Sequence, residues 1–157
     1  MCSPIRLTRP GARAAVKPEA LWEHDQAQGL SAADFMAASE ARSAFHARML
    51  ALFERFDVVA LPATQVWPFP IEQTWPRTIA GRAMDTYHRW MEVTIYATFC
   101  GAPAISMPAG FHDNGRWPAG LQLVAAPGDD ARLLRVAAAY ETLSAAMLAL
   151  RSAQPAW

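Results

Sequence analysis

The sequence Gly101-Ala-Pro-Ala-Ile-Ser-Met-Pro-Ala-Gly110 decides the fold, because it joins the end of a helix to a short buried strand. Glycine commonly ends helices, so the apolar pattern upstream predicts a helix over 84–100 that stops at Gly101. The prolines at 103 and 108 bracket the apolar run 104–107, which predicts a strand that neither proline allows to continue. A helix leading directly into a buried strand is therefore the centre of the predicted fold.

Two further segments complete a small sheet. Phe56-Asp-Val-Val-Ala-Leu-Pro62 predicts a strand over 58–61, and Ala119-Gly-Leu-Gln-Leu-Val124 predicts another over 119–125. The strands 58–61 and 104–107, joined by the helix, form a βαβ unit that we expect to be parallel and right-handed. The Asn-Gly reversal at 114–115 predicts antiparallel pairing of 104–107 with 119–125. The fold class is therefore α/β, a small mixed β-sheet with packed helices, whose outer strands leave open edges.

The remaining segments are helices and one long loop. We expect a helix over 18–30, a long helix after the capping-box pair Ser31 and Asp34, and a last helix opened by Pro127-Gly-Asp-Asp130. Arg42 and His46 are assigned to faces of the long helix other than its apolar face. The loop 62–80 holds four prolines and several aromatic residues, and loops of this length are usually functional. An apolar stripe on the last helix comprises Leu133, Leu134, Ala137, Tyr140, Leu143, Met147 and Leu150. Residues 1–16 are interpreted as a flexible or non-homologous leader, and 17–157 as a partial domain.

Composition excludes several classes of function. The chain has 157 residues and zero net charge, with 14 basic and 14 acidic side chains, so no basic face for nucleic acid is expected. No apolar run has the length of a signal peptide or a membrane span. Only two cysteines occur, far apart, which indicates a reducing compartment and a cytoplasmic location. The chain is 53% hydrophobic and only 18% charged, which fits either an alanine-rich core or a piece of a larger body.

The titratable residues form no recognisable metal or cofactor motif. The four histidines show no ligand spacing, and no glycine-rich phosphate loop is present, so we expect neither a metal nor a cofactor. A thiol site that combines Cys100 with His88 is also disfavoured. The two residues are twelve positions apart on the predicted helix, roughly 18 Å by helical rise. Cys100 is therefore interpreted as a buried, inert thiol.

The segments above, in this order, resemble the C-terminal part of amidase signature enzymes. The resemblance runs from near Lys17 to about Glu141 and covers most of this chain but only the closing part of such an enzyme. It departs from the family at Thr98, where relatives often have Asn, and at Trp117, where a Leu-Pro-Val sequence is more usual. The matching set comprises Phe56-Asp57, Thr94 through Gly101-Ala-Pro103, Pro108-Ala-Gly110, Gly120-Leu-Gln122, Leu133-Leu134 and Tyr140-Glu141.

The resemblance implies hydrolysis of carboxylic amides by a Ser nucleophile, a second Ser and a Lys base in a Gly- and Ser-rich segment. This chain has one lysine, Lys17, and none of its serines has that setting, so no catalytic residue is transferred and Ser106 is interpreted as a filler. The first hypothesis is an incomplete, truncated amidase that is inactive alone. The alternatives are a binding or assembly module, which pairs with a catalytic chain or with itself, and an independent hydrolase that uses Cys100 or a serine.

The resemblance also implies a role for the aromatic residues. In the complete parent enzyme the substrate is a small-molecule amide, and the closing segment packs against the catalytic core. By that analogy the candidate substrate-pocket wall consists of Trp67, Phe69, Trp75 and Trp90. A plain core role is the competing interpretation for each of them, because exposed aromatic clusters are rare in monomers.

Overall fold

The computed structural model describes residues 11–113 and 115–149, without the side chains of 146–149. The chain divides into two compact units, Met1–Ala41 and Arg42–Trp157, and the boundary falls inside one long helix. We call them the N-terminal unit and the sheet unit and describe each by itself. The predicted class, a small sheet with packed helices, is confirmed, and the sheet lies wholly in the second unit.

The N-terminal unit is helical. It contains the 3₁₀ helix η1 (Ala12–Ala15), helix α2 (Pro18–Ala27) and the beginning of α3 (Ala32–Phe53). The predicted capping box is confirmed: the Ser31 amide donates to Asp34 Oδ2 at 2.9 Å, and the Asp34 amide donates to Ser31 Oγ at 3.2 Å. The segment interpreted as a leader contains η1, and its residues 1–10 lie outside the described part.

The sheet has the strand order β1-β5-β4, with β1 (Val59–Pro62), β4 (Ala104–Phe111) and β5 (Pro118–Val124). Both ladders are antiparallel, so β1 and β4 run parallel to each other, as predicted for the βαβ unit. They are not hydrogen-bonded to each other, because β5 lies between them. The central position of β5 agrees with its burial: residues 122–125 are all buried, as befits a central strand covered on both faces.

Strand β4 continues past the predicted stop at Pro108 as far as Phe111, with a register irregularity between these residues. Proline is tolerated there because β4 is an edge strand, and the Pro108 carbonyl accepts a hydrogen bond from Tyr140 Oη at 2.7 Å. The predicted reversal follows. Asn114 lies outside the described residues, and on either side of it the His112 amide donates to the Trp117 carbonyl at 2.8 Å.

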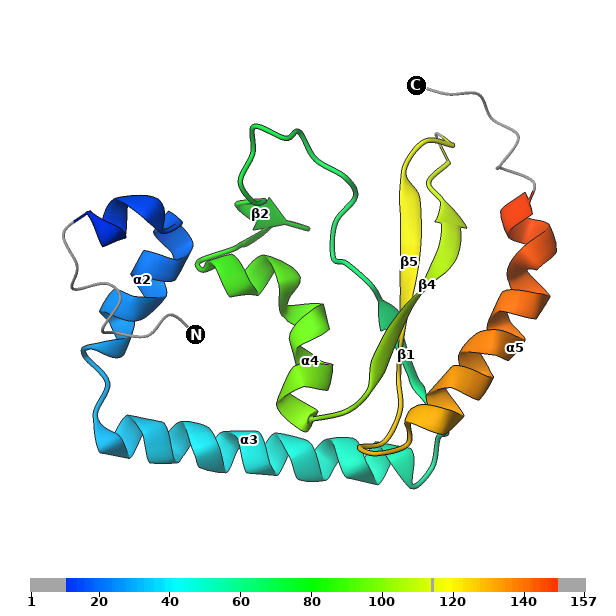
Figure 1. The fold of residues 1–157 in the computed structure, drawn as a ribbon, viewed down its shortest axis with the longest axis horizontal. Coiled ribbons are helices and arrows are strands. Elements are labelled where there is room, and N and C mark those ends of the chain that lie inside the picture. The colour runs from blue at the N-terminus through cyan, green and yellow to red at the C-terminus, as the bar shows by residue number, and fades with distance from the viewer. Residues whose placement is uncertain (1–10, 114, 150–157) are drawn as a thin grey trace. The chain divides into compact units, whose positions relative to one another are not determined.

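The two faces of the sheet are covered by different helices, α4 (Glu92–Cys100) and α5 (Asp130–Ala149), which lie on either side of it in Figure 1. On the α5 face the core consists of Met107, Leu123, Ala125, Leu133 and Ala137. The predicted stripe on α5 is therefore confirmed for Leu133, Ala137 and the partly buried Tyr140. It is wrong for Leu134 and Leu143, which are exposed. The side chains of Met147 and Leu150 lie outside the described part.

Helix α4 is held at both ends by side chains from distant segments. At its start, the Val93 amide donates to Gln65 Oε1 at 3.0 Å, and Gln122 Nε2 donates to the Val93 carbonyl at 3.2 Å. At its end, Arg42 Nε donates to the Phe99 carbonyl at 3.1 Å, and His46 Nδ1 lies 2.9 Å from the Cys100 carbonyl. Arg42 and His46 therefore satisfy the last carbonyls of α4, and the sequence pattern did not predict these contacts.

The start of this helix also differs from the prediction. We expected one α-helix over 84–100. In the structure, residues Tyr87–Met91 form a 3₁₀ helix, η2, and the α-helix α4 begins only at Glu92. Its predicted end is confirmed, since Gly101 adopts a left-handed conformation with φ 66°.

The loop before η2 contains a small hairpin, β2 (Thr78–Ile79) with β3 (Arg82–Ala83). Ala80 and Gly81, both at positive φ, form the tight turn between these strands.

Candidate functional site

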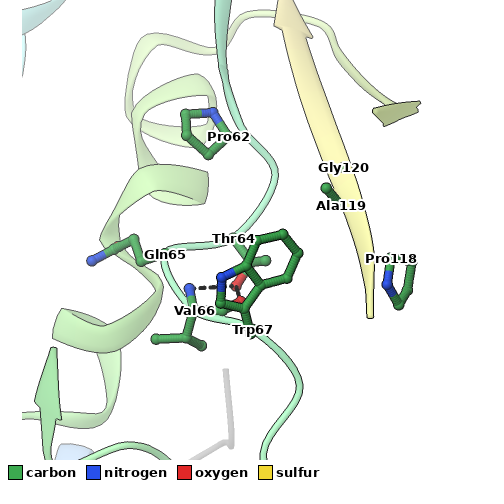
Figure 2. Close-up of a pocket in the computed structure, with 8 residues that line it drawn as sticks. All are labelled: Pro62, Thr64, Gln65, Val66, Trp67, Pro118, Ala119 and Gly120. Atoms are coloured by element: carbon green, nitrogen blue, oxygen red, sulfur yellow. Dashed lines mark hydrogen bonds between the residues drawn. The ribbon is translucent and has the colours of Figure 1, made fainter. Parts of the chain in front are cut away.

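A pocket lies where β1 ends and β5 begins. Figure 2 shows its lining, and its volume is about 270 Å³. One wall is the end of β1 with the loop that follows it, and the other wall is the first three residues of strand β5. The eight residues that line it are Pro62, Thr64, Gln65, Val66, Trp67, Pro118, Ala119 and Gly120.

The pocket exists because the backbone of β5 approaches the end of β1 very closely. The Ala63 amide donates to the Gly120 carbonyl at 2.8 Å, which continues the β1–β5 ladder by one residue. A Cβ atom at Gly120 would lie 2.7 Å from the Ala63 Cβ and 3.3 Å from Ser106 Oγ. Only glycine fits at this crossing without displacement.

The loop wall is ordered by its own polar groups. Thr64 Oγ1 lies 3.4 Å from both the amide and the carbonyl of Val66, which closes a short turn seen in Figure 2. The next side chain, Gln65, accepts the hydrogen bond from the Val93 amide described above. The polar atoms in this wall therefore serve the chain itself, and the loop is attached to the first turn of α4.

An aromatic rim stands beside the pocket, made by Trp67, His112 and Trp117. The Trp67 ring meets His112 edge-on with 4.8 Å between the ring centroids, and Trp117 lies 6.4 Å from Trp67. The His112 and Trp117 rings are 5.2 Å apart. Trp67 and Trp117 remain 41% and 39% exposed. The rim therefore presents aromatic surface beside the pocket, and two of its members, His112 and Trp117, lie in the connection between β4 and β5.

The four residues predicted as a substrate-pocket wall occupy two places. Trp67 lines the pocket, whereas Phe69, Trp75 and Trp90 belong to a separate aromatic cluster built around Tyr87. Trp75 is buried there, and the Arg77 guanidinium stacks 3.8 Å from the centroid of its ring. The buried Trp90 Nε1 has no acceptor within the described part of the chain.

Several pocket residues were not assigned to any site by the sequence reasoning, notably Gln65, Pro118 and Gly120. Their positions follow from a pairing that the pattern alone did not reveal, because β5 lies directly against β1. The available signal was the pair of residues Pro62 and Gly120. The first ends one strand, and the second allows the other strand to come close.

The thiol of Cys100 has a histidine neighbour, but it is His46 rather than His88. Cys100 Sγ lies 3.7 Å from His46 Nδ1, and the side chain is 2% exposed. Because a carbonyl only accepts, the 2.9 Å contact with the Cys100 carbonyl requires the hydrogen to be on Nδ1, so this nitrogen cannot take a proton from the thiol. Burial also raises the pKa of the thiol. The geometry therefore favours a structural Cys100.

Two other kinds of feature do not occur in residues 11–113 and 115–149. No cluster of three or more His, Cys, Asp or Glu side chains in these stretches could hold a metal ion. None of the helices described there is long and apolar enough to cross a membrane. The serine hydroxyls with assigned partners serve local structure: Ser31 caps α3, and Ser144 donates to the Glu141 carbonyl.

Comparisons with known proteins place these elements in a family. The profile of the Amidase family matches residues 10–134, a match that reaches back into the stretch interpreted as a leader. A glutamyl-tRNA(Gln) amidotransferase subunit of Thermus thermophilus is 39% identical over 106 residues, which are 66% of this chain and 20% of that protein. Fatty acid amide hydrolase of Medicago truncatula is 34% identical over 116 residues, or 74% of this chain and 19% of that protein.

Solved structures show the same relation. A bacterial aryl acylamidase of the amidase signature family superposes with a TM-score of 0.76 at 24% identity, over 94% of this chain and 31% of that chain. A 6-aminohexanoate cyclic dimer hydrolase superposes with a TM-score of 0.68 at 25% identity, over 87% of this chain and 30% of that chain. This chain spans about a fifth of the length of the curated relatives it matches. The fold, the ordered segments and the matched residues together show that the chain belongs to the family of amidase signature enzymes.

Proposed function

We propose that this chain forms one wall of an amide-hydrolysing body and does not hydrolyse amides by itself. The observation that carries the proposal is the asymmetry of the structural match. Nearly all of this chain, 94%, superposes on the aryl acylamidase, yet it accounts for only 31% of that enzyme. The scaffold of a family member is therefore present, while most of such an enzyme lies outside these residues.

The chemistry supports inactivity of these residues alone. An amide carbon is a poor electrophile, so hydrolysis needs an activated nucleophile and donors for the developing oxyanion. The single lysine, Lys17, belongs to the N-terminal unit, and Ser31 is committed to a helix cap. Cys100 is buried, with a histidine that donates rather than accepts at the near nitrogen. In this proposal the nucleophile and the base come from additional protein.

The contribution of this chain is then to shape the substrate site. Trp67 is the strongest candidate for the predicted wall, since it lines a pocket and is partly exposed. Phe69, Trp75 and Trp90 are proposed to form a second part of that wall or its support. The Trp90 indole supports this proposal. Its buried Nε1–H has no acceptor within the described residues, although buried donors normally find one. Additional protein or a substrate would supply that acceptor.

The test has two arms. The purified 157-residue chain is first incubated with benzamide and hexanamide, and ammonia release is measured. We expect no rate above buffer. In the second arm, this chain replaces the corresponding 31% of the aryl acylamidase. We expect the chimera to hydrolyse aryl amides faster than a control enzyme from which that 31% has been deleted. Hydrolysis by the isolated chain, or a folded chimera without activity, would overturn the proposal.

A second candidate function is an assembly module that pairs with a catalytic chain or with itself. Exposed apolar side chains favour it, especially Ile71, 95% exposed, and Leu143, 84% exposed. The open edges of β1 and β4 also offer backbone groups for pairing. Light scattering after size-exclusion chromatography decides this candidate. A concentration-dependent dimer supports self-association, whereas a monomer that binds no apolar dye contradicts it.

We also propose a cytoplasmic location, which rests only on the presence of two widely separated cysteines in the sequence.

A further inference from the structure

The pocket at the β1–β5 crossing carries information about the substrate. We propose that it holds an uncharged aromatic group of the amide, attached to either the acyl or the amine side. This inference rests on the proposed function, because it assumes that the pocket belongs to the site where an amide is bound. It narrows that function from amides in general to neutral amides with a ring.

The size of the pocket suits a ring rather than a long chain. Its volume is about 270 Å³. An engineered protein cavity of about 150 Å³ is large enough to bind benzene, so this pocket holds one ring with its attached carbon. It is smaller than the space needed to bury a long acyl chain completely, since pockets for drug-sized ligands begin at about 300 Å³.

The lining carries no charge. None of its eight residues has an ionisable side chain, and four of them are Pro62, Val66, Pro118 and Ala119. Two of its polar atoms are committed to the chain, since Thr64 Oγ1 bonds to Val66 and Gln65 Oε1 accepts from the Val93 amide in the first turn of α4. An ammonium or carboxylate placed here would lose part of its hydration without gaining an oppositely charged partner among the lining residues. The pocket therefore favours a neutral group over a zwitterionic amino-acid amide.

The aromatic rim favours a flat ring over an aliphatic group of the same volume. Trp67 is both a lining residue and a member of the rim, and it already makes an edge-on contact with His112. Aromatic rings prefer edge-on or offset contacts with centroids about 4.5–7 Å apart, so a bound ring extends this arrangement. The rim is backed by the hydrogen bond from the His112 amide to the Trp117 carbonyl, which limits its rearrangement.

The direct test is ligand binding to the full 157-residue chain, without any catalysis. The probe is 4-fluorobenzamide, followed by ¹⁹F NMR line broadening, and hexanamide and L-glutamine are added as competitors. We expect saturable binding of the probe, weak displacement by hexanamide and none by L-glutamine. Trp67→Leu should weaken binding by about two- to tenfold, the range that one aromatic contact supplies. Trp22→Leu, in the N-terminal unit, is the matched control and should leave binding unchanged.

Circular dichroism distinguishes a folding defect from a loss of binding in each variant. If Trp67→Leu is not folded, Ala119→Val takes its place, because it fills the pocket from the opposite wall. Absence of saturable binding, equal displacement by L-glutamine, or binding that neither pocket variant changes overturns the inference. Binding of the probe together with an inactive chimera would instead refute the proposed function and leave the pocket assignment in place.

Discussion

Replacing Gly120 by alanine tests the central packing claim, that β1 and β5 cross too closely for any side chain. The added Cβ would stand 2.7 Å from the Ala63 Cβ, whereas ordinary contacts begin at about 3.4 Å. The end of β1 must therefore move by several tenths of an ångström. Overpacking of this kind costs about 1–3 kcal/mol of unfolding free energy. For a chain of this length, that corresponds to a melting temperature lowered by roughly 3–10 °C.

The assay is a double-mutant cycle measured by urea unfolding. Ala63→Gly removes the atom that the new methyl group would strike, at a conformational cost of about 0.5–1 kcal/mol. The double variant should therefore be nearly as stable as Ala63→Gly alone. Gly101→Ala is the matched control: it is strained by its positive φ, nothing stands near its Cβ, and Ala63→Gly should not rescue it. Additivity of Gly120→Ala and Ala63→Gly within about 0.5 kcal/mol would refute the reasoning.

Three further outcomes are expected. Gln122→Met should lower the free energy of unfolding by about 1 kcal/mol, the usual net value of one hydrogen bond. Gln122→Glu should lower it clearly more, because it buries a carboxylate against the Val93 carbonyl. Equal losses of the two variants in urea unfolding would contradict this expectation. Iodoacetamide at pH 8 should modify Cys100 at least about tenfold more slowly in the folded chain than in urea, since burial raises the pKa of its thiol, and equal rates would count against burial. The Ser31 hydroxyl lowers the pKa of Asp34 in the folded chain. The cap therefore stabilises the fold above the unfolded-state pKa of about 3.9, and this stability is lost as the pH falls through the folded-state pKa. The helical circular dichroism signal should decline over that pH range, and it should decline less in Ser31→Ala.

Features that depend on neighbouring residues could be predicted from the sequence. Gly101 ends a helix because the left-handed conformation costs it nothing, and the Ser31–Asp34 cap is a contact over three positions. Each of these features is set by residues only a few positions apart.

Features set by pairing across the chain could not be predicted. The parallel orientation of β1 and β4 was predicted, but the position of β5 between them was not, because β1 and β5 are far apart in the sequence. The contacts of Arg42 and His46 with the end of α4 could not be predicted because their partners lie 57 and 54 positions away. The pocket escaped for the same reason, since its two walls meet only through the β1–β5 ladder. Trp67 was named as a candidate because it is aromatic, and it lines the pocket, whereas Gly120 became a lining residue only through its pairing with the end of β1.

The attachment of α4 has a consequence for the order in which the chain folds. A helix of nine residues is too short to persist in water on its own. Its four anchoring side chains come from α3, the loop after β1, and β5, so every anchor closes a loop of at least 28 residues. We therefore expect helix α4 to form late, after the hairpin and the long helix are in place. A nascent chain that stops before β5 is expected to hold this segment as unstructured polypeptide.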